Sequence, residues 1–243
     1  MALPLTAPRA ALPKQLANFT NSTGGLDLTL RLIQAVAIVA AHVLVDNVDN
    51  VTIKRCWLAV SQLALARRYL RFFCFLDCFY NAHGLLTAES PNGGRSLLRI
   101  MELVESTLLG LYFVMEDLTM LHDMDIWQVP WYTPVLMEAN KLWLYAIALS
   151  ITRTAWNLVS GPAAQKEVPK ANTDTSEKKA KPSPPPPSPS KAYLLKRIIV
   201  DCCDFTLPAS FLGWVPLGDF GVGVAMTVSS VLAWPDLWAT TQR

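Results

Sequence analysis

The residues best suited to chemistry lie together between positions 53 and 86. No proline interrupts this stretch, and it ends near a glycine-rich turn, so it predicts one continuous helix, 53–86. At about 100° per residue, its large apolar side chains gather on one side of that helix. They are Leu58, Leu65, Tyr69, Phe72, Phe73, Leu76 and Tyr80. Arg67, Arg68 and Arg71 fall on the other side, so the helix is basic and amphipathic.

A basic amphipathic helix has two possible roles. Its apolar side could insert among phospholipid head groups while the arginines attract anionic lipids, which would make all ten side chains membrane-binding residues. Alternatively, the aromatic side packs inside the protein's own bundle and the arginines form its solvated side. The residues alone leave both interpretations open. Insertion would expand one leaflet of the bilayer and favour convex curvature.

Other clusters of reactive side chains are weaker. Cys74 and Cys78 share a helical side near His83, but a fourth metal ligand is missing, and free cysteines commonly pack as small apolar groups. His122, Asp123 and Asp125 fit a polar loop better than a ligand site. No nucleophile elbow, zinc-protease motif or phosphate-binding loop occurs. The sequence therefore predicts no enzyme, no metal and no cofactor.

Composition places the chain near a bilayer. Of its 243 residues, 52% are apolar and only 16% are charged, against about 25% charged in an average soluble domain. The net charge of +2 gives no basic footprint for nucleic acid. No stretch of about eighteen residues is free of charged side chains, however, so several strongly hydrophobic spans are not expected. These features fit a protein that lies on, or partly in, a membrane.

Apolar periodicity predicts an all-α fold, a membrane-associated bundle of five to six helices. The expected helices cover 26–44, 53–86, 95–122, 135–159, 193–212 and 217–238. The last is the predicted C-terminal transmembrane helix, because 220–234 carries no charge and 217–238 is long enough for a hydrocarbon core of about 30 Å. The alternative is a buried C-terminal helix of a soluble bundle.

Small residues recur along that last helix, at Gly221, Gly223, Ala225 and Thr227. Such spacing lets membrane helices approach closely. Self-association and packing against the helix at 135–159 explain it equally well.

The chain divides into four parts. Residues 1–22 are rich in proline and predict a flexible leader, followed by a helical bundle over 23–160. Residues 161–190 are rich in proline and lysine and predict a disordered linker, since they hold almost no large apolar side chain. Residues 191–243 hold an amphipathic helix and the transmembrane helix.

Four stretches in this order resemble the peroxin-eleven family of peroxisomal membrane proteins. They are Gly25–Gln34, Leu63–Ala82, Leu103–Leu121 and Leu194–Val231. Each is mainly an apolar helix with a few fixed polar positions, so the resemblance depends on the order of the four stretches and not on any one of them. The long linker and the aromatic second helix depart from the family pattern and are closest to a divergent fungal branch.

The resemblance implies a protein that elongates peroxisomes and prepares them for fission, through an amphipathic helix and a C-terminal membrane segment. It also implies a homo-oligomer that works with a fission adaptor and a dynamin-like GTPase. A rival function is a pore for small metabolites, formed by several of the helices. Charges within most of those helices speak against it.

Overall fold

The structure, a computed structural model, describes residues 11–43, 50–87, 97–160 and 190–242. Within these ranges it contains nine helices and no strand, which confirms the all-α prediction. The predicted number of five to six helices was wrong. The helices are α1 (Leu12–Asn21), α2 (Thr23–Val43), α3 (Asn50–Leu70), α4 (Cys74–Thr87), α5 (Leu97–Leu118), α6 (Met120–Asp123), α7 (Tyr132–Ser160), α8 (Lys191–Phe211) and α9 (Gly218–Thr241).

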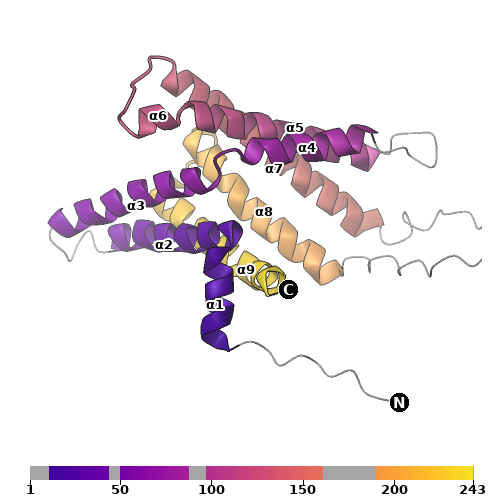
Figure 1. The fold of residues 1–243 in the computed structure, drawn as a ribbon, viewed down its shortest axis with the longest axis horizontal. Helices are drawn as coiled ribbons and strands as arrows, with labels where there is room; N and C mark the ends of the chain where they lie inside the picture. Colours follow the sequence, from indigo (N-terminus) through magenta and orange to yellow (C-terminus); the bar gives the residue numbers. More distant parts are fainter. Residues whose placement is uncertain (1–10, 44–49, 88–96, 161–189, 243) are drawn as a thin grey trace, which may run out of the picture.

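The long helices close into a ring. Helix α2 packs on α3 and on α9, α4 packs on α5, α5 on α7, α7 on α8, and α8 returns to α9. Figure 1 shows α2 beside α3, α4 beside α5, and α8 crossing between these two groups. Because α3 and α4 follow each other along the chain, they join the two groups of helices.

The single helix predicted for 53–86 is broken in two. The chain turns at Arg71–Phe73, where Phe73 has a φ of 69°, a backbone conformation that bulky residues rarely adopt. The Asp117 carboxylate of α5 accepts a hydrogen bond from the Phe73 N–H at 3.2 Å and so holds this turn against α5. The break lets α3 pack along α2 while α4 packs along α5.

The helix predicted for 95–122 is also divided, because α5 ends at Leu118 and the short α6 begins at Met120. Between them the Thr119 hydroxyl donates to the Glu116 carbonyl at 2.9 Å. The remaining predicted helices are confirmed, with bounds shifted by a few residues. They are 26–44, 135–159, 193–212 and 217–238, which correspond to α2, α7, α8 and α9.

The flexible leader predicted for 1–22 is wrong for its second half. Residues 12–21 form α1, which begins with a proline in its first turn, a position that suits proline because its missing N–H would have no helical partner there. Phe19 is fully buried, and its ring centroid lies 4.6 Å from that of Trp234 and 5.2 Å from that of Trp238. An aromatic contact with α9 therefore orders this segment.

The predicted linker, 161–190, lies outside the described residues except for Ser190. The Ser190 hydroxyl accepts a hydrogen bond from the Tyr193 N–H at 3.2 Å and caps the start of α8.

Two of the described helices, α2 and α9, are long and apolar enough to cross a membrane. The sequence predicted the second but not the first. Only 28% of the apolar window in α2 and 22% of that in α9 is buried, whereas a buried helix of a soluble bundle would be covered on most sides. The two helices lie antiparallel, since Gly24 faces Leu237 at one end and Gly223 faces Ile38 at the other.

Candidate functional site

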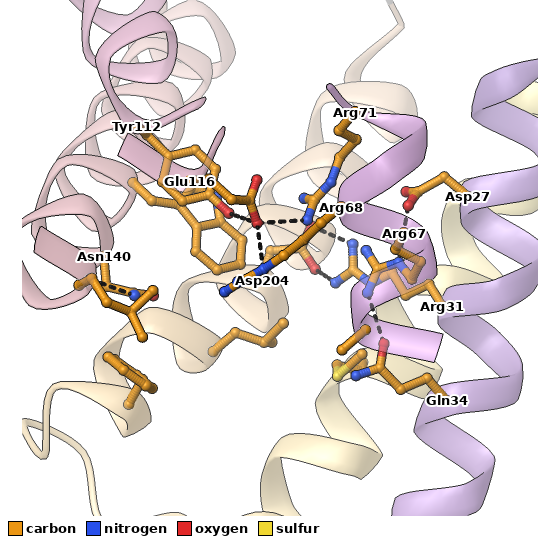
Figure 2. A pocket seen from close by; sticks show the side chains of 16 residues that line it. Asp27, Arg31, Gln34, Arg67, Arg68, Arg71, Tyr112, Glu116, Asn140 and Asp204 are labelled. Atoms are coloured by element: carbon orange, nitrogen blue, oxygen red, sulfur yellow. Dashed lines mark hydrogen bonds and ion pairs between the residues drawn. The ribbon is translucent and has the colours of Figure 1, made fainter. Parts of the chain in front are cut away.

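A polar cavity of about 360 Å³ lies inside the ring of helices. Side chains from α2, α3, α5, α7, α8 and α9 line it, and Figure 2 shows them converging. Its charged lining residues are Asp27, Arg31, Arg67, Arg68, Arg71, Glu116 and Asp204. The molecule thus gathers charges in its interior while many large apolar side chains stay on its surface.

Arg67 joins α3 to α2. Its Nε donates to Asp27 Oδ1 at 2.9 Å, and its Nη1 donates to Gln34 Oε1 at 3.0 Å. Burial lowers the pKa of Arg67 while the charge of Asp27 opposes this shift. The group stays protonated, because a guanidinium titrates far above neutral pH.

Glu116 is the acceptor for the other two arginines of this stretch. Its Oε1 lies 2.9 Å from Arg71 Nη2 and 3.3 Å from Arg68 Nε, and it also accepts from the Tyr112 hydroxyl at 3.1 Å. The Glu116 side chain is only 5% exposed. Arg68 also pairs with Asp123 of α6. These contacts join α3 and the turn after it to α5 and α6.

A fourth arginine, Arg31, joins α2 to the C-terminal helices. It pairs with Asp204 of α8 and donates from Nη2 to the Ser229 hydroxyl of α9 at 2.9 Å. The ion pairs, together with the hydrogen bond to Ser229, therefore connect α2, α3, α5, α6, α8 and α9 around one cavity. Figure 2 shows most of these side chains.

The predicted basic side of 53–86 exists, but it faces the interior. Arg67, Arg68 and Arg71 all lie opposite the aromatic side chains and point toward carboxylates rather than away from the molecule. Sequence reasoning missed this because the partners are distant in the chain. Asp27 is 40 residues from Arg67, and Glu116 is 45 from Arg71. Contact between these arginines and anionic lipids remains a prediction that this geometry does not favour.

The apolar side of the same stretch faces outward. Exposed fractions reach 57% for Phe73, 58% for Leu76 and 78% for Tyr80. We call the exposed set the aromatic face: Leu58, Tyr69, Phe72, Phe73, Leu76 and Tyr80. Leu65, also predicted, is half-buried. The interpretation in which these rings pack inside the bundle is therefore wrong.

An apolar hollow of about 440 Å³ adjoins the aromatic face. Tyr69 and Phe72 form one wall, and residues from the end of α5 to the turn after α6 form the rest. These are Asp117, Leu118, Met120, Leu121 and Met124. The hollow extends the apolar surface from α3 and α4 onto α6.

The small residues of α9 serve contacts within the chain. A Cβ on Gly223 would lie 2.9 Å from Ile38 Cγ2 and 3.1 Å from Val39 Cγ2, so the glycine lets α9 approach α2 closely. The sequence had suggested a second copy or the helix at 135–159 instead. Gly221 and Ala225 are half-buried, and the Thr227 hydroxyl donates to the Gly223 carbonyl at 2.8 Å. Self-association through this set remains a prediction.

Replacing Gly223 by leucine is expected to lower the free energy of unfolding by about 2 kcal/mol, because the new side chain would force α2 and α9 apart. Thermal unfolding in a mild detergent, followed by circular dichroism, measures the change. Gly84→Leu is the control, since no heavy atom lies within 4 Å of a Cβ at that position. Equal stability of the two variants would show that the close approach is unimportant.

A second polar cluster lies between α5, α7 and α8. Glu105 Oε2 pairs with Arg153 Nη2 at 3.0 Å, and Asp201 Oδ2 accepts from the Ser150 hydroxyl at 2.8 Å. Burial raises the pKa of both carboxyl groups, although the neighbouring cations partly offset it. In each case the charged form is therefore less favoured in the folded chain than in the unfolded one.

Asp201→Asn should be at least as stable as the wild type at pH 7. The raised pKa of Asp201 means that folding costs free energy above that pKa, where the carboxylate is charged, and asparagine removes this cost while still accepting from Ser150. The penalty disappears below the unfolded pKa of about 4, so the advantage of the variant should vanish there. Unfolding scans at several pH values measure it. A variant that is less stable at pH 7 and recovers on acidification would contradict the sign.

The remaining reactive side chains have structural partners. His122 Nδ1 accepts from the Val129 N–H at 3.0 Å, and its ring stacks on Tyr132 at 3.9 Å between centroids. The Tyr132 hydroxyl donates to Asp123 at 2.6 Å. His122 and Asp123 belong to the short helix α6, so the predicted polar loop begins only after them. Burial raises the pKa of Cys74 and Cys78, which keeps both as thiols at neutral pH.

Interior charges are paired and many large apolar side chains are exposed, as expected for a helical membrane protein. The family model described as Peroxisomal biogenesis factor 11 (PEX11) matches residues 14–238. The chain belongs to this family. It is a peroxisomal membrane protein and a peroxisome biogenesis factor. Neither the curated proteins nor the solved structures contain a match to the chain.

Proposed function

We propose that this protein curves and elongates the peroxisomal membrane, and so promotes fission, by inserting the aromatic face into one leaflet. The observation that carries the proposal is the outward position of these side chains together with the inward pairing of the arginines. The aromatic face can enter the head-group region without carrying those charges with it.

The energy available is sufficient for firm insertion. Fully burying one large apolar side chain contributes about 1.5–3 kcal/mol. The six members of the aromatic face are 40% to 78% exposed, so each gains roughly half of that amount. Their sum is about 6 kcal/mol before ordering costs. The neighbouring apolar hollow enlarges the contact and could receive lipid chains displaced by the rings.

Attachment to a ring of helices makes the insertion an effective wedge. Glu116 and Asp117 of α5 hold Arg71 and Phe73, so the aromatic face cannot move freely relative to the bundle. Helices α2 and α9 have the length to anchor the same bundle in the bilayer. A shallow wedge fixed to such anchors expands one leaflet, and many copies side by side favour convex curvature. Homo-oligomers, a fission adaptor and a dynamin-like GTPase are the partners we propose for this step.

A pore for small metabolites is the second candidate function, and one observation favours it. The helices line a polar cavity of about 360 Å³, and a path for soluble metabolites needs such a polar lining.

Reconstitution of the full chain into liposomes separates the two. We expect vesicles to become tubules while a trapped small dye is retained. Dye release from vesicles that stay round would support the pore and contradict curvature generation. In cells, deletion and overproduction should shorten and lengthen peroxisomes marked with a second protein.

A further inference from the structure

We propose that the central cavity is a binding site for a phosphate group. Its volume of about 360 Å³ falls at the small end of ligand pockets, which span roughly 300–1,000 Å³. A phosphate with a short attached moiety therefore fits better than a larger cofactor.

The donors converge as phosphate recognition requires. Four guanidinium groups line the cavity, from α2, from α3 and from the turn that follows α3 (Figure 2). Each guanidinium offers five N–H donors in a planar fork that matches phosphate oxygens in pairs. A cationic ligand would instead be repelled by these guanidiniums at close range.

Two nitrogen atoms of these guanidiniums have no partner among the described residues. The Nε atoms of Arg31 and Arg71 are buried and have no hydrogen-bond partner within the described ranges. A buried donor without a partner costs free energy, so an anion that accepts from it gains more than it would from a solvated arginine. Both residues line the cavity, Arg31 from α2 and Arg71 from the turn after α3, and an acceptor between them would satisfy both.

The charges around the cavity are balanced, so an anion would depend on hydrogen bonds rather than on net charge. The lining has four arginines and three carboxylates, Asp27, Glu116 and Asp204, and Asp123 of α6 pairs with Arg68 from outside the lining. Glu116 Oε1 is shared by Arg68, Arg71 and Tyr112, so it does not saturate any one of them.

Part of the wall is apolar. Leu136, Trp143 and Phe211 contribute to it, which suits the carbon skeleton of a phosphate ester. The ester could be a lipid head group or a small soluble molecule, and both share the phosphate chemistry.

The test is calorimetric titration of the full chain in a neutral detergent. Two probes distinguish the sources: glycerol 3-phosphate, which is soluble, and dihexanoyl phosphatidic acid, which carries acyl chains. Arg71→Gln removes a donor, and Ala64→Phe fills the cavity without touching an ion pair. Arg55→Gln is the matched control, because this arginine is exposed on α3 outside the lining.

We expect saturable binding to the wild type and to the control, and binding about tenfold weaker or worse in both cavity variants. Equal binding of the two probes identifies a soluble phosphate ester, and binding of the lipid alone identifies a head group. Absence of saturable binding to the wild type overturns the proposal. Unchanged binding in both folded cavity variants also overturns it. If circular dichroism shows that Arg71→Gln does not fold, Ala64→Phe decides.

Discussion

A variant that carries Tyr69→Gln, Phe73→Asn, Leu76→Gln and Tyr80→Gln is expected to lose nearly all liposome tubulation. Each change removes an exposed apolar side chain from the aromatic face. At about 1 kcal/mol for each half-exposed side chain, the loss is about 4 kcal/mol, or about a thousandfold in the equilibrium for insertion. Electron microscopy of reconstituted vesicles measures tubule length at fixed protein density.

The four substitutions should leave the fold intact. The side chains are 46%, 57%, 58% and 78% exposed, so they contribute little to the core. Glutamine is a good helix former, and asparagine tolerates the positive φ at position 73 better than most residues do. The thermal unfolding midpoint should therefore stay close to that of the wild type.

A matched control changes four exposed apolar side chains of α7 and α8 to glutamine. They are Trp156, Val159, Tyr193 and Leu195. This control should keep tubulation. Equal loss in both variants would mean that general surface hydrophobicity, and not the aromatic face, drives curvature.

Replacing Glu116 by alanine is expected to lower the free energy of unfolding by about 3–5 kcal/mol. Its side chain is 5% exposed and accepts from Arg68, Arg71 and Tyr112, so its removal leaves buried cations without their acceptor. A folded protein commonly has only about 5–15 kcal/mol to lose. Thermal or chemical unfolding in detergent measures the change.

Glu138→Ala is the control for this variant. Glu138 is 59% exposed and pairs with Lys141 one turn away, a type of contact that contributes little. The free energy of unfolding of the Glu138→Ala variant should match that of the wild type. If both variants lose the same amount, the interior ion pairs do not hold the ring together.

Much of the fold could be predicted from local patterns. Periodic apolar positions located α2, α7, α8 and α9, because each of these helices has a continuous side that packs on a neighbour. The same periodicity separated the arginines from the aromatic rings on 53–86. That separation depends only on helical geometry, so it survives in α3 and α4.

The side of the 53–86 stretch that faces the protein interior could not be predicted, because it depends on partners that are distant in the sequence. Arginines can face solvent, lipid or carboxylates, and only the folded chain brings Asp27 and Glu116 to them. The turn at Phe73 was equally hidden, since no glycine or proline marks it and a carboxylate from α5 stabilises it. The sequence around Phe19 likewise does not indicate its contact with Trp234.

The partners of Arg31 are synthesised long after α2. Asp204 and Ser229 lie 173 and 198 residues further along the chain, so α2 emerges from the ribosome long before either is synthesised. A cation within an apolar segment is costly in lipid until it is neutralised. If α2 crosses the bilayer, its stable integration must therefore await the synthesis of α8 and α9, and chains that stop before α8 should not integrate stably.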